Sequence, residues 1–477
     1  MVADPGATKP STKRGIMPKQ ILFNAFSMNC VGHINHGLWT HPRDQSTEFN
    51  TLRYWTDLAR TLERGLFDGI FLADILGVYD VYGGSVDLTL RESIQLPVHD
   101  PMMLVSAMSA VTEHLGFGVT VNANAEPPYL FARRMSTLDH LTGGRMGWNI
   151  VTGYLDSAAR AIGNSAMTAH DDRYDQAEEA LELLYKLWEG SWDDDAVRKD
   201  KTNRVYADPA KVHAIHHAGR FYRSEGYHLT APSPQRTPVL YQAGTSERGR
   251  RFAARHAECI FISAPDAATA RKTSRLLRAD AVEAGRKPED IKIFVGISIV
   301  PSATEAEAQE KHVDYCRYAS PEAGMAHFSA GSGIDLAKLD LDDPIVKDSA
   351  PGNAIQSGIE AARKRGLTKR QLLDGLGIGG RYPTFVGTGS QIADSLARFV
   401  EEGEIDGFNL TRTVVPESYE DFVTFVVPEL QARGLYKTAY SGSTLRHQLF
   451  GAGPRLSSPH PAADARRRKI QLQTDPQ

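Results

Sequence analysis

Hydrophobic and polar positions follow one another along the chain in blocks that predict strands and helices in turn. Short, mostly apolar runs such as ILFNAFS at 21–27 have the length and composition of buried strands. Between them, longer segments place apolar residues three and four positions apart, as Phe131, Met135 and Leu138 do, which is typical of a helix with one buried face. The predicted strands are 21–27, 67–73, 116–121, 145–151, 238–242, 258–263, 291–300 and 406–410.

This alternation favours a (β/α)8 TIM barrel, of the α/β class, over an open doubly wound sheet. No GxGxxG motif opens the first turn from strand to helix, which weakens the case for a dinucleotide-binding fold. We therefore expect one barrel domain over residues 20–435.

Four long segments interrupt the alternation: 28–50, 75–99, 190–236 and 318–384. Loops of this length are uncommon in a compact domain unless they build a lid or a pocket. We interpret them as insertions over the C-terminal face of the barrel. The ends of the chain are polar, so we expect residues 1–19 to form a disordered arm and 436–477 a C-terminal extension that becomes a solvated polar tail from 457 onwards.

Composition and charge exclude several classes of protein. The 477 residues include 54 Lys and Arg against 58 Asp and Glu, and a net charge of −4 offers no electrostatic case for binding nucleic acid. No apolar run is long enough to cross a bilayer, and the first residues lack the apolar core of a secretory signal. The three cysteines form no CxxC pair, which indicates reduced thiols in a cytoplasmic protein.

Polar residues stand where the predicted barrel strands end. In a TIM barrel these ends meet at one mouth and build the active site. Any one of these residues could equally cap the following helix, so the set is more informative than its members. The set is Asp74, Thr120, Asn149, Thr152 and Ser246.

The segment GTSERGR at 244–250 begins a helix with a hydroxyl, Ser246, and two arginines, Arg248 and Arg250. Exposed amides and cations at a helix start suit an anion such as a phosphate, although a capped basic surface helix has the same pattern. His170 and Tyr174 lie four residues apart, so they share one helix face and could bind the same phosphate. An equally good interpretation is that His170 only caps the helix and Tyr174 only packs in the core.

Two groups of histidines are candidates for chemistry, one for metal binding and one for contact with substrate. His213, His216 and His217 alternate with apolar residues, which favours a strand and hairpin over a metal site, and we predict no metal. His33 and His36 occupy the loop after the first strand, on the expected catalytic face, together with His41. One of them could orient a substrate, although a solvated loop histidine is the simpler reading of each.

Eight motifs carry a resemblance to a known family that spans residues 20–450. The chain resembles the flavin-dependent monooxygenases of the bacterial-luciferase superfamily, in the branch of the nitrilotriacetate and dibenzothiophene-sulfone monooxygenases. The stretches at 24–33 and 76–85 resemble the members that oxidise dimethyl sulfide. The eight motifs are ARTLERGLFDGIFLAD, AVTEHLGFGVT, ARRMSTLDHLTGGRMGWNIVT, AHDDRY, YKLWEGSWDDDAV, YADPAKVH, SPQRTPVLYQAGTSERGRRFA and DGFNL.

The resemblance implies a luciferase-like barrel that uses FMN as FMNH2, supplied by a separate NAD(P)H:flavin oxidoreductase, with O2 as co-substrate. By this resemblance, the residues expected to contact FMN are Asp74, Thr120, His170, Tyr174 and Ser246. Asn149 and Thr152 are expected to line the flavin as well. The candidates for contact with substrate are Phe26, His33, His36 and Trp39.

We therefore expect a monooxygenase acting on a small organosulfur compound such as dimethyl sulfide, with cleavage of C–S to a thiol and an aldehyde. A homo-oligomer, dimer or tetramer, is expected. The alternatives are a monooxygenase of sulfones, aminocarboxylates or other xenobiotics, a deazaflavin-dependent dehydrogenase, and a non-catalytic flavin-binding subunit.

Overall fold

Eight parallel strands close into a barrel in the computed structural model, which describes residues 19–244, 246–345, 366–380 and 382–472. Each strand pairs with the next around the ring, and β13 pairs with β1 to close it, with Phe23 opposite Phe408. The predicted TIM barrel is thus confirmed. Its strands are β1 (Leu22–Met28), β2 (Gly69–Ala73), β3 (Gly116–Asn122), β4 (Met146–Val151), β9 (Val239–Gln242), β10 (Cys259–Ile262), β11 (Lys292–Ser302) and β13 (Gly407–Thr411).

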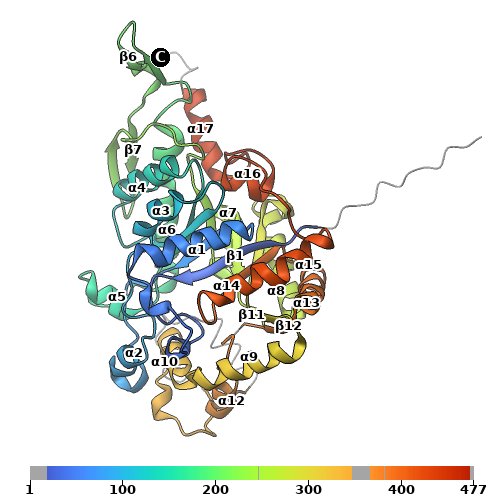
Figure 1. The fold of residues 1–477 in the computed structure, drawn as a ribbon. Coiled ribbons are helices and arrows are strands. Elements are labelled where there is room, and N and C mark those ends of the chain that lie inside the picture. Colours follow the sequence, from blue (N-terminus) through green and yellow to red (C-terminus); the bar gives the residue numbers. More distant parts are fainter. Residues whose placement is uncertain (1–18, 245, 346–365, 381, 473–477) are drawn as a thin grey trace, which may run out of the picture.

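Helices surround this barrel on the outside (Figure 1). Many begin at a side-chain cap: the Thr51 hydroxyl accepts from the amide of Tyr54, and Thr304 and Glu307 form a reciprocal capping box. The main helices are α1 (Leu52–Arg64), α3 (Met102–Ser109), α4 (Pro128–Leu141), α6 (His170–Tyr185), α7 (Glu247–His256), α8 (Ala267–Glu283), α9 (Glu305–Tyr318), α13 (Gly389–Gly403), α14 (Glu417–Asp421) and α15 (Val427–Ala432).

One strand that pairs with the barrel was not predicted. β12 (Thr384–Thr388) pairs in parallel with the last part of β11, from Ser298 to Ser302, so it lies outside the barrel ring. β11 has eleven residues and extends past the ring, which leaves an edge for β12 to pair with.

Three of the four insertions cover the C-terminal end of the barrel. The segment 28–50 follows β1 and 75–99 follows β2, where it forms α2 (Asp87–Arg91). The segment 318–384 forms α10 (Pro321–Ser332) and α12 (Lys369–Asp374); α10 contacts both α2 and α12. Residues 346–365 of this insertion lie outside the described residues.

The fourth insertion, 190–236, was wrongly assigned to the same face. It connects helix α6 to the start of β9, so it joins the opposite, N-terminal end of the barrel. It forms two hairpins, β5 (Val197–Asp200) with β6 (Val205–Ala207), and β7 (Ile215–Ala218) with β8 (Arg223–Gly226). The predicted hairpin around His213, His216 and His217 is confirmed. In Figure 1, β6 and β7 lie near α17, away from α2 and α10.

The C-terminal segment also differs from the expected solvated tail. Helix α16 (Leu445–Phe450) and helix α17 (Pro461–Leu472) both pack on the rest of the molecule. His460, Ala462 and Ala463 are buried, because α17 lies against the single π-helical turn Lys186–Gly190 at the end of α6. The predicted N-terminal arm, 1–19, lies outside the described residues except for Lys19.

Within the described ranges, no helix combines the length and the apolar character that crossing a membrane requires.

Candidate active site

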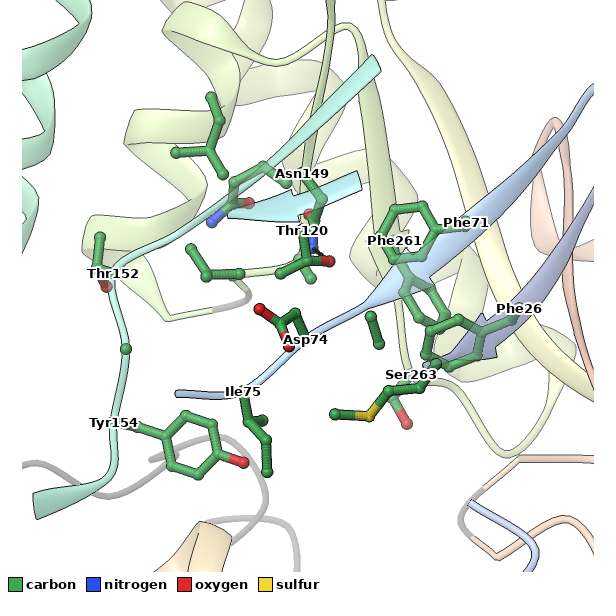
Figure 2. A pocket seen from close by; sticks show the side chains of 18 of the residues that line it. Phe26, Phe71, Asp74, Ile75, Thr120, Asn149, Thr152, Tyr154, Phe261 and Ser263 are labelled. Atoms are coloured by element: carbon green, nitrogen blue, oxygen red, sulfur yellow. Dashed lines mark hydrogen bonds between the residues drawn. The ribbon is translucent and has the colours of Figure 1, made fainter. Parts of the chain in front are cut away.

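A cavity of about 340 Å³ opens at the carboxyl ends of the barrel strands. Its wall is formed by strand ends β1 to β4, β9 and β10, by the start of α6, and by the insertions after β1, β2 and β11. All seven residues proposed for cofactor binding line it, so the structure brings together positions from 74 to 246. These are Asp74, Thr120, Asn149, Thr152, His170, Tyr174 and Ser246. Figure 2 shows the first four of them.

Thr120 and Asn149 occupy the ends of the paired strands β3 and β4, directly opposite one another. The Asn149 Nδ2 amide donates to Thr120 Oγ1 at 2.9 Å, and both side chains are buried. The other amide atom, Asn149 Oδ1, is buried and has no hydrogen-bond partner among the described residues. A buried acceptor of this kind carries a free-energy cost until a donor reaches it.

Asp74 directly follows β2 and faces the cavity beside Ile75 (Figure 2). Burial raises the pKa of its carboxyl group from 3.8 to about 7, with a smaller contribution from the negative charge of Asp100, while the backbone amide of Ile75 opposes the shift. The group can therefore hold or release a proton near neutral pH.

His170, Tyr174 and Ser246 form a cluster at the side of the cavity where α6 and α7 begin. Ser246 is the N-cap of α7 and its Oγ accepts from the amide of Gly249, while His170 Nε2 lies 3.4 Å from the same oxygen. A Cβ on Gly244 would lie 2.6 Å from the Tyr174 hydroxyl, so the glycine permits this close approach. Donors gathered at a helix N-terminus suit an anion.

The arginines expected at this anion site were assigned wrongly. Arg248 pairs with Asp175 at 2.9 Å and Arg250 pairs with Asp280 at 2.9 Å, and neither lines the cavity. The arginine that does line it is Arg173, which is buried and lies one turn along α6 from His170. Arg173 was missed because it stands among the acidic residues at the start of α6, where a sequence pattern suggests surface ion pairs.

The barrel end of the cavity is aromatic. The ring of Phe26 lies 5.6 Å from that of Phe71 and 4.9 Å from that of Phe261 (Figure 2). His33 contacts Phe26 edge to face, with 4.6 Å between the ring centroids. Of the four candidates for substrate contact, Phe26 and His33 line the cavity.

The other two candidates, His36 and Trp39, do not line the cavity. The Trp39 indole donates to the backbone oxygen of Glu92 at 3.1 Å and so joins two insertions. His36 Nε2 lies 3.0 Å from Nδ1 of His327, which does line the cavity. His36 is thus a neighbour of a wall residue, and burial lowers its pKa to about 4.

Sequence reasoning missed several wall residues. Gln242 is the last residue of β9, so the rule that marked the other strand ends would have found it. Others come from the insertions, where no periodic pattern marks them: Tyr79, Gln95, His327 and Tyr382. Tyr154 lies in the loop after β4.

A closed parallel barrel with a cavity at its strand ends, where polar groups from several loops gather, defines a barrel enzyme. Residues 32–405 match the family model of the luciferase-like monooxygenases. The chain belongs to this family and is a flavin-dependent monooxygenase.

Similar proteins include enzymes with different substrates. A long-chain alkane monooxygenase of Geobacillus thermodenitrificans is 49% identical over 448 residues, covering 94% of this chain and 98% of that protein. A dimethyl-sulfide monooxygenase of Hyphomicrobium sulfonivorans is 46% identical over 453 residues, covering 94% of each. A crystal structure of a riboflavin lyase with modified FMN and riboflavin aligns with a TM-score of 0.89 at 41% identity, covering 94% of this chain and 100% of that one.

Proposed function

We propose that the chain is an FMNH2-dependent monooxygenase that uses O2 to oxygenate a small organosulfur compound. The observation that carries this proposal is the cavity at the strand ends, whose wall combines the polar cluster at the start of α7, a buried amide oxygen and aromatic rings. A flavin mononucleotide needs all three features: an anion site for its phosphate, acceptors for its ring N–H groups, and apolar contacts for the ring.

The residues present fit each part of FMN. Ser246, His170 and Tyr174 would hold the phosphate at the N-terminus of α7, with Arg173 supplying a buried positive charge. Asn149 and Thr120, with Thr152 beside them, would contact the ring. The riboflavin lyase with a similar fold contains modified FMN, which supports this choice of flavin.

Bound reduced flavin supplies the electrons that activate oxygen, and the protein supplies placement and a water-poor environment. The wall of Phe26, Phe71 and Phe261 keeps the barrel end of the cavity apolar. Asp74, with its pKa near 7, is the carboxyl group that would hold or release a proton beside the ring.

We propose dimethyl sulfide as the substrate, with cleavage of a C–S bond to a thiol and an aldehyde. The aromatic wall suits a compact, uncharged molecule, and one similar enzyme is named for this substrate. An alkane is the second candidate, because the same apolar wall would suit it and a similarly close relative is named for alkanes.

The partners of the reaction remain predictions. A relative named as component A of nitrilotriacetate monooxygenase, 35% identical over 443 residues, supports a separate flavin reductase. The homo-oligomer and the cytoplasmic location also stay predictions.

The test is an assay of the purified chain with FMN, NADH and a generic flavin reductase. Dimethyl sulfide should give methanethiol and formaldehyde only when both O2 and the reductase are present. An alkane and dibenzothiophene sulfone are run in parallel, and omission of the reductase is the control. Oxygen uptake that yields only hydrogen peroxide with every substrate would contradict the proposed reaction. Oxidation of a substrate with deazaflavin in the absence of O2 would favour the dehydrogenase alternative.

A further inference from the structure

One part of the aromatic end of the cavity is built by an insertion and not by a barrel strand. β1, β2 and β10 each contribute a ring to this end, those of Phe26, Phe71 and Phe261. Among the described wall residues, none comes from β11. Tyr382, from the insertion 318–384, lines the cavity, and the centroid of its ring lies 5.9 Å from that of Phe261 and 6.5 Å from that of Phe26.

Gly296 of β11 leaves the space for this ring. Residues two positions apart along a strand point to the same side of a sheet. Phe294 packs in the same buried cluster as Phe26 and Tyr382, inside the barrel, so Gly296 also faces the barrel interior. A Cβ at Gly296 would lie 2.6 Å from Cδ1 and from Cε1 of Tyr382, and 2.9 Å from Cγ. The tyrosine ring therefore occupies the place that a side chain of β11 would fill.

Backbone hydrogen bonds hold Tyr382 at this place. The oxygen of the next residue, Pro383, accepts from the amide of Ser298 at 3.0 Å, and the pairing of β11 with β12 continues from there. The amide of Tyr382 itself donates to the oxygen of Gly379 at 3.0 Å. Because these bonds fix the backbone, a methyl group added at Gly296 would displace the ring away from β11 and into the cavity.

We propose that Tyr382, whose ring lies against Gly296, limits the size of the substrate that the aromatic end of the cavity accepts. This inference rests on the proposed function, and it adds the residue that determines specificity for substrate length. With the ring in place, this end of the cavity suits a compact sulfide such as dimethyl sulfide. Without the ring, the space between Phe261 and β11 opens, and the chains of larger dialkyl sulfides can be buried there.

The experiment measures kcat/KM for diethyl and dibutyl sulfide relative to dimethyl sulfide, in the assay with FMN, NADH and a flavin reductase. Tyr382→Ala should raise the ratio of dibutyl to dimethyl sulfide by about tenfold or more, because the added methylene groups can then be buried. Gly296→Ala should lower the ratio of diethyl to dimethyl sulfide by about tenfold, because the displaced ring narrows the cavity.

Three further variants serve as controls, and thermal unfolding checks that each variant folds. Tyr382→Phe keeps the ring and should keep the ratios of the wild-type chain. Gly377→Ala adds a methyl group to the same insertion at a point where no described heavy atom beyond the adjacent residues lies within 4 Å, so it should also leave the ratios unchanged. In a Tyr382→Ala background, Gly296→Ala should have little further effect, because the atoms nearest to the added methyl group all belong to Tyr382.

A second measurement needs no turnover. The dissociation constants of the same sulfides from the flavin-free chains, measured by titration calorimetry, should shift in the same directions. The dissociation constant of FMNH2, measured by equilibrium dialysis without oxygen, should stay the same in Tyr382→Ala and Gly296→Ala.

Unchanged ratios in both Tyr382→Ala and Gly296→Ala would overturn the inference. A loss of FMNH2 affinity in both variants would also overturn it, because the ring would then contact the flavin and not the substrate. If the wild-type chain forms no product from any sulfide, the proposed function fails, and the calorimetric ratios still decide whether Tyr382 limits the cavity. Binding of no sulfide by any of the chains, together with no product, would overturn both.

Discussion

At the scale of single residues, Asp74 shows how a place at the end of a barrel strand changes the pKa of a side chain. Asp74 is the first residue after β2, so its carboxyl group lies in the cavity wall. Burial there raises the pKa of the carboxyl group to about 7. Because its folded-state pKa is raised, the folded protein binds the proton more tightly than the unfolded chain does. Ionised Asp74 therefore lowers stability as the pH rises from about 4 to about 7.

Asp74→Asn should remove this dependence. The variant should match the wild type below pH 4, where the carboxyl is protonated in both states, and should exceed it by about 4 kcal/mol above pH 7. Urea unfolding of the flavin-free protein across this pH range measures the difference. A constant difference at all pH values would mean that Asp74 is not the group that titrates, and loss of flavin affinity in the same variant would support its place beside the ring.

The residues at strand ends could be predicted, whereas those on loops could not. Thr120 and Asn149 follow from the rule that parallel strands end at a common mouth, which needs only the strand boundaries. Predicting that Arg173 and not Arg248 lines the cavity requires knowing which face of each helix meets the barrel. The sequence does not show this, because both arginines have charged neighbours. Tyr79 and His327 depend on how the insertions fold over one another, which no periodicity encodes.

At the scale of elements, helix α16 closes the end of the barrel opposite the cavity. Arg446 donates from Nε to Glu258 Oε1 at 2.6 Å and from Nη2 to Oε2 at 2.9 Å, just before β10 begins. The same guanidinium donates to the backbone oxygens of Thr237 and Pro238, just before β9. The sequence analysis predicted this segment only as an extension of the domain. Its packing against the barrel could not be predicted, because an ion pair between residues 188 positions apart leaves no local pattern.

Arg446→Met should lower the free energy of unfolding by about 3–5 kcal/mol, because it leaves the carboxylate of Glu258 buried without its partner. Arg275→Met is the control: Arg275 pairs with Glu404 on the surface, where water screens the two charges, so its loss should cost far less than the loss of Arg446. Denaturant unfolding of both variants makes the comparison. Equal effects would show that α16 contributes little to closing the barrel.

Elements with a strong periodic pattern were predictable at this scale, and irregular ones were not. All eight barrel strands were predicted to within about two residues, because each is a continuous apolar run between polar ends. β12 escaped notice because it pairs only with the end of β11 that extends past the barrel ring. α17 escaped notice because its segment is rich in charged residues.

At the scale of the whole molecule, three insertions far apart in the sequence are fastened to one another over the cavity. The backbone amides of Gln95 and His99 donate to Gly32 and Asn29, which ties 75–99 to 28–50. The amide of Ser320 donates to the oxygen of His36, and that of Gly379 to the side chain of Asn35, which ties 318–384 to the same loop. The segment 28–50 is thus the common anchor of the roof.

Because these insertions share one anchor, a ligand in the cavity should stabilise them together. Hydrogen exchange measured without oxygen, with and without FMNH2, should show slower exchange in peptides from 28–50, from 75–99 and from α10 around His327.

The hairpins β5–β6 and β7–β8 provide an internal control, since they come before β9 and contribute no side chain to the cavity wall. Their exchange should not change, because local opening there is independent of the roof. Protection confined to the start of α7 would mean that the phosphate site acts alone, and equal protection of the hairpins would mean that the ligand stabilises the molecule globally without engaging the roof.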